Sequence, residues 1–274
     1  MATPNAPTPT TPAPNPEFSG NVLFYSKPEP LSRELHGKIG LRRVEKPFGF
    51  ASKTNVVPLT VGEFPMAALS YPVIFAGERY QPLAVMGISQ GTNLFVGEDG
   101  SFEIGAYIPA YIRRYPFVLA NDQSRGQLVV CIDRGSSLLG EDCALPFFDE
   151  KGEATEYTNG CIEFCNNFET EGRRTEAFVN LLKELDLFEV KRSTMTPANP
   201  DGTPGEPQPL AEYFAVSEEK LRALPADKLQ ELVGNGAVAQ IYAHLTSLIG
   251  WDRLVALAMA RAQTQAAPTP ANVN

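Results

Sequence analysis

The sequence lacks any long hydrophobic stretch. No apolar run approaches the roughly 18 to 20 residues that a helix needs to cross a bilayer, so we predict no membrane insertion. Residues 1–8 have neither the basic region nor the apolar core of a secretory signal peptide. These absences predict a cytoplasmic protein, although export by a non-classical route would leave no mark on the sequence.

Positive charge is in the minority. The 274 residues include 23 lysines and arginines against 32 aspartates and glutamates, which gives a formal net charge of −9 at pH 7. Nucleic-acid binding depends on a basic surface that releases counterions, and docking on anionic lipid also requires positive charge. We therefore expect no nucleic-acid partner and no membrane partner.

Cysteine and histidine are scarce. The four cysteines are too few and too irregularly spaced for a disulfide scaffold, and there are only two histidines. Cys161 and Cys165 are one helical turn apart, but a zinc site needs two further ligands and the chain has no Cys-x-x-Cys pair. We interpret the cysteines as packing residues and expect no metal and no cofactor.

An ordinary globular composition lies between two tails of low complexity. Hydrophobic residues make up 43% of the chain and charged residues 20%. Residues 1–17 and 264–274 are rich in Pro, Thr, Ala and Asn, and they cannot bury enough apolar surface to offset their ordering entropy. We predict disorder in both tails and a single domain over residues 18–263.

Residues 18–135 have the pattern of an antiparallel β-meander, because short apolar runs alternate with polar turns. Thr60 is a candidate N-cap for one short helix that ends near Ser70. Residues 107–117 are read as packed sheet. The other predicted strands are residues 21–25, 38–44, 73–76, 83–86, 93–96, 102–104 and 128–132.

Residues 136–263 change to helical spacing. Apolar side chains recur every three or four positions from Glu156 onward, which indicates two successive amphipathic helices, and a loop is expected over 194–209. Further helices are predicted over 217–224, 226–233 and 237–262, with Gly234 and Gly236 at the stop between the last two. The predicted fold class is α+β, with an N-terminal antiparallel sheet followed by a helical C-terminal half.

Two patterns resemble parts of an enzyme. Residues 87–91 match the Gly-x-Ser-x-Gly nucleophile elbow, but that elbow needs a helix after Ser89, and residues 92–96 read as a strand. We interpret them as a hairpin turn. His244 lies on a predicted helix, where a buried, hydrogen-bonded histidine is favoured over a catalytic one. His36 lies in a connection flanked by Pro and Glu residues and is predicted to be solvated.

The densest cluster of aromatic and cationic residues is 107–117. On a strand, Arg113 and Arg114 would point to opposite faces, so that one could pair with a carboxylate such as Asp133 and the other could face an anionic ligand. The competing interpretation is that both arginines stabilise strand ends by ion pairs and stacking. The candidate residues for ligand or partner binding are Tyr107, Tyr111, Arg113, Arg114 and Tyr115.

Several motifs in order resemble the SapC family of proteobacteria, and the resemblance runs from about residue 20 to 257. The motifs are EFP at 63–65, YPVIF at 71–75, NLFV at 93–96, YIPAYIRRYPF at 107–117, CID at 131–133, FDEKG at 148–152 and YAHLTS at 242–247. The resemblance implies a link to surface-layer formation. It also implies protein partners among halogenase-like proteins and TonB-dependent receptor systems. It supplies no established catalytic residues.

Three functional hypotheses follow. The leading one is a non-catalytic accessory or binding protein that serves surface-layer or TonB-dependent uptake systems. The alternative is an enzyme for a small anionic or aromatic substrate, with Arg113 or Arg114 as the anchor and Asp133 and His244 as acid–base candidates. The third is a structural subunit of a surface layer, which would self-assemble.

Overall fold

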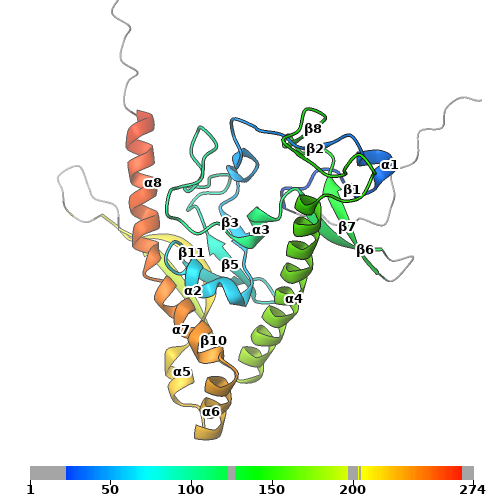
Figure 1. The fold of residues 1–274 in the computed structure, drawn as a ribbon. Helices are drawn as coiled ribbons and strands as arrows, with labels where there is room; N and C mark the ends of the chain where they lie inside the picture. The colour runs from blue at the N-terminus through cyan, green and yellow to red at the C-terminus, as the bar shows by residue number, and fades with distance from the viewer. Residues whose placement is uncertain (1–22, 123–126, 197–202, 204, 267–274) are drawn as a thin grey trace, which may run out of the picture.

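The computed structural model describes residues 23–122, 127–196, 203 and 205–266. The predicted tail 1–17 lies outside these residues, as does 267–274, while 264–266 belong to the last helix, α8 (Gly250–Ala266). Figure 1 shows the helices α4 (Glu156–Glu184) and α8 as two arms of a V, with strands between them. The predicted α+β class, with antiparallel sheets first and helices second, is confirmed.

The largest sheet has five antiparallel strands in the order β10-β11-β4-β5-β3. The predicted hairpin is confirmed, because β4 pairs with β5 across a turn in which Gly77 has a φ of +69°. Two of the strands come from the second half of the chain, where the sequence predicted only helices and a loop. The strands are β3 (Val56–Pro58), β4 (Val73–Ala76), β5 (Gln81–Val85), β10 (Phe188–Met195) and β11 (Gln208–Val216).

Two three-stranded sheets complete the β structure, in the orders β1-β7-β6 and β8-β2-β9. The predicted strand 128–132 is confirmed within β7, whereas Leu23 and Phe24 form a turn and the predicted strand 38–44 shortens to β2. Residues 93–96 and 102–104 meet only at one bridge, between Val96 and Phe102. The strands are β1 (Pro28–Pro30), β2 (Gly40–Leu41), β6 (Phe117–Asp122), β7 (Gln127–Asp133), β8 (Leu139–Gly140) and β9 (Leu145–Pro146).

The prediction of a strand over 107–117 is wrong. The segment contains the short helix α3 (Ala110–Arg113), with Arg114 at its C-cap, and only Phe117 enters a strand. The amide groups of Arg113 and Arg114 donate to the carbonyl oxygens of Pro109 and Ala110, both at 3.0 Å. Proline lacks the N–H that a strand ladder requires but suits the start of a helix, so Pro109 favours the turn over the strand.

The helices lie mainly in the second half, and α4 is one continuous helix of 29 residues where the sequence predicted two. Thr60 is confirmed as the cap of the predicted short helix, with Glu63 completing a capping box. The predicted helix 237–262 divides into α7 and α8. The remaining helices are α1 (Arg33–His36), η1 (Gly49–Ala51), η2 (Val61–Glu63), α2 (Phe64–Ala67), α5 (Glu218–Arg222), α6 (Ala226–Gly234) and α7 (Ala237–Ser247).

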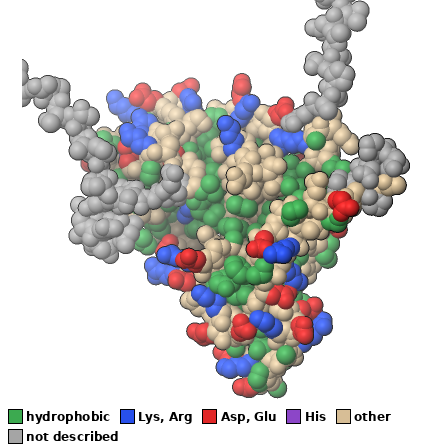
Figure 2. Space-filling model, turned by 180° about the vertical axis from the view of Figure 1, so that it is seen from behind, with side chains coloured by type: hydrophobic (Ala, Val, Ile, Leu, Met, Phe, Trp, Pro, Cys, Tyr) green, Lys and Arg blue, Asp and Glu red, His purple; other side chains and the backbone are tan. Residues whose placement is uncertain are grey.

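Helix α4 packs on two separate hydrophobic clusters. Phe178 belongs to the main cluster beside the five-stranded sheet, and Cys165 belongs to a second cluster with Phe117, Ile132 and Phe147. Seen from behind, hydrophobic side chains gather over the middle of the molecule, and charged ones lie around them and over the narrow end (Figure 2). Helix α4 therefore has neighbours along its whole length, and this positions the groove described below.

Candidate functional site

A groove of about 650 Å³ lies between α3 and the first turns of α4. We call it the arginine groove, because both arginines of the 107–117 segment line it. Its lining residues are Arg113, Arg114, Glu156, Tyr157, Gly160, Cys161 and Phe164. The sequence identified the two arginines as candidates, but it gave no indication that α4 supplies the opposite wall.

Arg114 packs against two aromatic rings that contact each other edge to face. Its guanidinium carbon lies 4.1 Å from the ring centroid of Tyr111 and 4.5 Å from that of Phe168. Contacts of this kind stabilise the cation by about 0.5 to 2 kcal/mol each. The Nε atom of Arg114 is buried and has no hydrogen-bond partner in the described part of the chain. A buried donor without an acceptor is costly, so this arginine is positioned but not fully satisfied.

Arg113 is exposed, and its orientation is fixed by its own segment. Its Nε donates to the carbonyl oxygen of Ile108 at 2.9 Å, and its Nη2 donates to the hydroxyl of Tyr107 at 3.1 Å. The guanidinium also lies 5.1 Å from the ring centroid of Phe164 on α4. Among the described residues neither Arg113 nor Arg114 forms an ion pair. The groove therefore presents two oriented cations without a carboxylate bound to either.

Glu63 is a residue of this region that sequence reasoning did not identify as part of it. The carboxylate is buried and accepts from the Tyr107 hydroxyl at 3.0 Å, from the Ala110 amide at 2.6 Å and from both donors of Thr60 at 2.8 Å. Burial, and next the nearby Glu63, raise the pKa of Tyr107 to about 12. Tyr107 therefore stays protonated at neutral pH and links Glu63 to Arg113. The sequence signal that could have identified Glu63 was the Thr-x-x-Glu spacing of the capping box.

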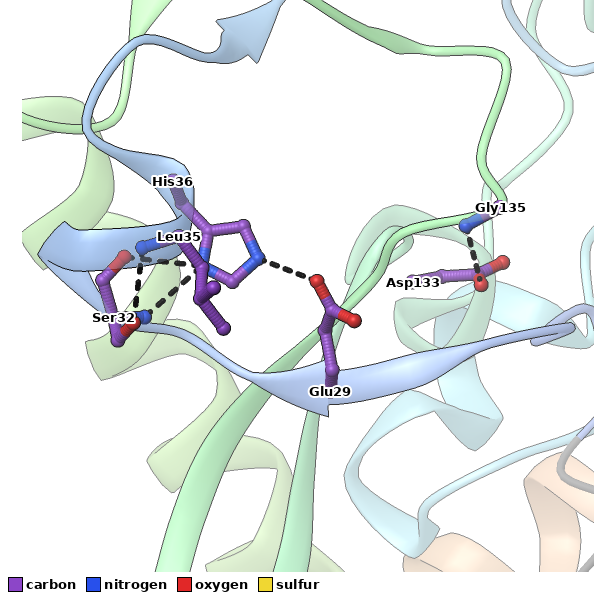
Figure 3. Close-up of polar contacts among 6 residues, drawn as sticks. All are labelled: Glu29, Ser32, Leu35, His36, Asp133 and Gly135. Atoms are coloured by element: carbon purple, nitrogen blue, oxygen red, sulfur yellow. Dashed lines mark hydrogen bonds and ion pairs between the residues drawn. The ribbon is translucent and has the colours of Figure 1, made fainter. Parts of the chain in front are cut away.

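Asp133 does not pair with either arginine, in contrast to the hypothesis drawn from the sequence. Its carboxylate is buried and accepts from the backbone and hydroxyl of Ser26 at 3.2 and 3.1 Å, from the Lys27 amide at 2.7 Å and from the Gly135 amide at 3.2 Å. The contact with Gly135 is drawn in Figure 3. The hydroxyl of Tyr115 donates to the same carboxylate at 3.0 Å. Tyr115 therefore holds Asp133 and does not line the arginine groove.

His244 is buried on α7 and joins two strands of the large sheet. One ring nitrogen, Nδ1, lies 2.8 Å from the Val73 carbonyl oxygen, and Nε2 accepts from the Val216 amide at 3.1 Å. Burial lowers the pKa of His244 to about 4. The ring is thus neutral at pH 7, with Nδ1 as the donor. His244 is the buried, hydrogen-bonded histidine that the sequence favoured.

The structure does not bring the proposed acid–base pair together. Asp133 lies at the end of β7 in one three-stranded sheet, and His244 lies on α7, which packs on the five-stranded sheet. Figure 1 shows β7 and α7 on opposite sides of the view. His36 was predicted to be solvated, and this is wrong. Its side chain is fully buried, with Nε2 at 2.9 Å from Glu29 and Nδ1 at 3.0 Å from the Ser32 carbonyl (Figure 3).

The other enzyme-like pattern is a turn. Gly91 has a φ of +77°, and the Leu94 amide donates to the Met86 carbonyl oxygen at 2.8 Å across the bend. The residues that follow Gly91 form turns and a bridge, with no helix before α3, so Ser89 lacks the geometry of a nucleophile elbow.

No metal site is visible among the described residues, because no three His, Cys, Asp or Glu side chains converge there. All four cysteines are free thiols, and burial raises the pKa of Cys161 in the arginine groove. In the same part of the chain no helix combines the length and the apolar character that a bilayer span requires.

The family model described as SapC matches residues 31–254, which is most of the chain. No curated protein and no solved structure matches the sequence. The motifs that carried the resemblance, including the arginine-bearing segment 107–117, lie within or overlap the matched range. The chain belongs to the SapC family.

Proposed function

We propose that the protein is a non-catalytic binding protein that holds an anionic group of a partner protein in the arginine groove. One observation carries the proposal. Arg113 and Arg114 are both held in place by aromatic rings, and within the described residues neither guanidinium is neutralised by a carboxylate. Two oriented guanidinium groups beside a cavity of about 650 Å³ suit a carboxylate ligand.

The physical basis of the proposal is that folding has already made Arg114 lose hydration in the free protein. Arg114 lost part of its hydration when it packed against Tyr111 and Phe168, and its Nε is buried. A ligand carboxylate in the groove would accept charge-assisted hydrogen bonds from the guanidinium groups of Arg113 and Arg114, which both line it. The protein as a whole carries a net charge of −9, which repels acidic molecules elsewhere on its surface. Binding of an anion would therefore concentrate at this groove.

Membership of the SapC family supports the choice of the partner system for this binding activity. The proposal includes a cytoplasmic role as an accessory to surface-layer or TonB-dependent uptake systems, with a protein of such a system as the partner. The enzyme alternative has less support, since Asp133 and His244 are both engaged in structural hydrogen bonds away from the groove.

The test is native mass spectrometry of the untagged protein, purified gently from its own host. We expect a protein partner on the unmodified chain and its loss from Arg113→Ala, Arg114→Ala or both. Arg173→Ala is the matched control, because Arg173 is an exposed arginine on α4 that does not line the groove. Circular dichroism checks that each variant is folded.

Retention of the partner by both groove variants would contradict the proposal. A small ligand or a metal ion in stoichiometric amount, in place of a protein, would favour the enzyme alternative. A bare monomer would count against both a stable partner and a self-assembling subunit.

A further inference from the structure

The face of α4 that lines the arginine groove continues along the helix into a second groove of about 490 Å³. The second groove lies between α4 and the segment that connects β4 with β5. We call it the lysine groove, and we define it by Arg79, Tyr80, Tyr111, Phe168, Glu176 and Lys183. Lining residues of the two grooves recur every three or four positions along α4, so the two grooves share one face of the helix. These are residues 157, 160, 164, 168, 172, 176, 179 and 183.

The two grooves adjoin at the ring stack around Arg114. Arg114 lines the arginine groove, while the two rings that it packs against, Tyr111 and Phe168, line the lysine groove. Phe164 and Phe168 are one helical turn apart on α4 and belong to the first and the second groove, respectively. A ligand that leaves the arginine groove along α4 therefore passes directly over this stack.

The lysine groove repeats the charge pattern of the first. Arg79 and Lys183 are exposed, and neither forms an ion pair with a described residue. The Lys183 ammonium lies 5.3 Å from the Tyr80 ring centroid. Each groove thus has two cations and one carboxylate, Glu156 in the first and Glu176 in the second. The excess of positive charge along this face contrasts with the net charge of −9.

The separation of the two charge clusters sets the size of the ligand. A helix rises 1.5 Å per residue, so Gly160 in the first groove and Val179 in the second are about 28 Å apart along α4. An extended polypeptide advances about 3.3 Å per residue and covers that length with about eight or nine residues. Small anions such as a single carboxylate reach only one of the two clusters.

We propose that the two grooves together bind one extended acidic segment of a partner protein. Acidic side chains near one end of the segment contact Arg113 and Arg114, and those near the other end contact Arg79 and Lys183. The middle of the segment crosses Phe168, which is partly exposed beside the buried Tyr111, and apolar or aromatic side chains gain contact area there. This inference rests on the proposed function and specifies the chemistry of the partner.

A polypeptide fits this face better than nucleic acid does. Nucleic acids bring closely spaced phosphates that need a continuous basic surface, whereas here Glu156 and Glu176 interrupt the cations. The carboxylates in the grooves also allow hydrogen bonds to the amide groups of an extended chain, which a phosphate backbone cannot offer.

The test uses fluorescence anisotropy with three fluorescein-labelled probes and the full-length protein. The two-ended peptide has a pair of aspartates at each end and a middle of about five residues composed of serine, glycine and phenylalanine, which makes about nine residues in all. The one-ended peptide has the same length but aspartates at one end only. A single-stranded oligonucleotide of similar length and charge is the third probe. We expect the two-ended peptide to bind about tenfold more tightly than the one-ended peptide, because both charge clusters are then engaged.

Three variants separate the two grooves. The double variant Arg79→Gln/Lys183→Gln should reduce binding of the two-ended peptide about tenfold, to the level of the one-ended peptide, which can still bind at Arg113 and Arg114. Arg113→Gln should weaken the two-ended peptide by a similar factor. Arg173→Gln removes the same charge from α4 outside both grooves and should change neither.

The outcomes distinguish this inference from the proposal on which it rests. Equal affinity of the two peptides, with sensitivity to Arg113→Gln, would overturn the extended segment and leave the arginine groove as the binding site. Loss of binding in Arg173→Gln, or binding of neither peptide, would overturn both. Tighter binding of the oligonucleotide than of the two-ended peptide would overturn the assignment of a polypeptide.

Discussion

His244 should make the stability of the protein fall steeply in mild acid. The histidine stands where β4 and β11 separate, since the two strands pair only at Phe75 and Phe214. Its Nδ1 donates to the Val73 carbonyl and its Nε2 accepts from the Val216 amide, so the ring joins the two strands in place of a direct ladder bond. The hydroxyl of Ser247 accepts from the Val73 amide at 2.8 Å and holds the same strand to α7.

Protonation would break this connection. A charged imidazole carries a hydrogen on both nitrogens, so Nε2 would confront the Val216 amide as a second donor. Burial is the largest cause of the lowered pKa, the bond to Val73 acts in the opposite direction, and the positive charge of Lys191 on β10 lowers the pKa further. His244 in the folded protein is therefore protonated only at a lower pH than in the unfolded chain, where the pKa of histidine is about 6.5.

The size and sign of the effect follow from the two pKa values. The folded pKa of about 4 lies below the ordinary value of 6.5, so the contribution of His244 to stability is fully present above pH 6.5 and is lost as the pH falls toward 4. Each pKa unit corresponds to about 1.4 kcal/mol, which gives a total loss of about 3 kcal/mol. At pH 4.5 the loss is already about 2.5 kcal/mol relative to pH 7.5.

The assay is urea unfolding of the unmodified protein and of His244→Gln at pH 7.5 and pH 4.5. Glutamine carries one acceptor and one donor and does not titrate, so it preserves the polarity of both hydrogen bonds. Carboxylates also take up protons in this range, but they do so in both proteins. Only the difference between the two pH dependences measures His244, and His36 is present in both.

We expect the free energy of unfolding to fall by about 2.5 kcal/mol more in the unmodified protein than in His244→Gln between the two pH values. Parallel losses in the two proteins would refute the reasoning, because they would mean that the buried ring is protonated without penalty. A smaller loss in the unmodified protein than in the variant would show that the sign is wrong.

Two further predictions concern buried groups. Asp133→Asn should lower the free energy of unfolding by about 2 to 4 kcal/mol, because an amide would turn its own N–H toward the donors of Ser26, Lys27 and Tyr115. Urea unfolding at neutral pH measures this loss. A loss below about 1 kcal/mol would contradict the assigned hydrogen bonds. In thiol titration of the native protein, the partly exposed Cys143 and Cys161 should react first and the buried Cys131 and Cys165 only on unfolding. Mass spectrometry of the modified peptides identifies the order, and early modification of Cys131 would contradict its burial.

The parts of the fold that the sequence predicted correctly depend on short-range signals. The hairpin of β4 and β5 follows from two apolar runs around Gly77, and the helix after Thr60 follows from a capping box. In both cases the residues that decide the conformation are within about ten positions of each other. The antiparallel start and helical end of the chain rest on signals of the same kind.

The segment 107–117 shows where that reasoning fails. Its tyrosines and isoleucines have high β-propensity, yet Pro109 favours the start of a helical turn. The side chains of Tyr111 and Ile112, which belong to that turn, are buried in the core. Local composition therefore supported two conformations, and packing against α4 selected one. The hairpin of β10 and β11 was missed for a related reason, because proline-rich residues near 194–209 concealed the alternation in Phe188–Met195.

The candidate site was predictable in its residue types but not in its partners. Arg113 and Arg114 were identified from composition, and a role for them in binding stays a prediction. Their neighbours Phe164 and Phe168 lie some 50 residues along the chain, and only their i, i+4 spacing on α4 indicated a shared face. The proposed partner of the arginines, Asp133, proved to be bound by backbone amides and Tyr115.

The distribution of carboxylates around the arginines gives the strongest reason to regard them as a binding site. An acidic protein has a surplus of partners for its arginines, yet the two buried carboxylates among the described residues, Glu63 and Asp133, accept from N–H and O–H donors instead. An exposed ion pair would contribute at most about 1 kcal/mol, so stability alone exerts little pressure to pair Arg113. Arg114 is different, because folding has already buried its Nε and packed its guanidinium against the rings of Tyr111 and Phe168. Part of its hydration is therefore lost before binding, and a carboxylate from another molecule would gain charge-assisted hydrogen bonds to a guanidinium that is already oriented.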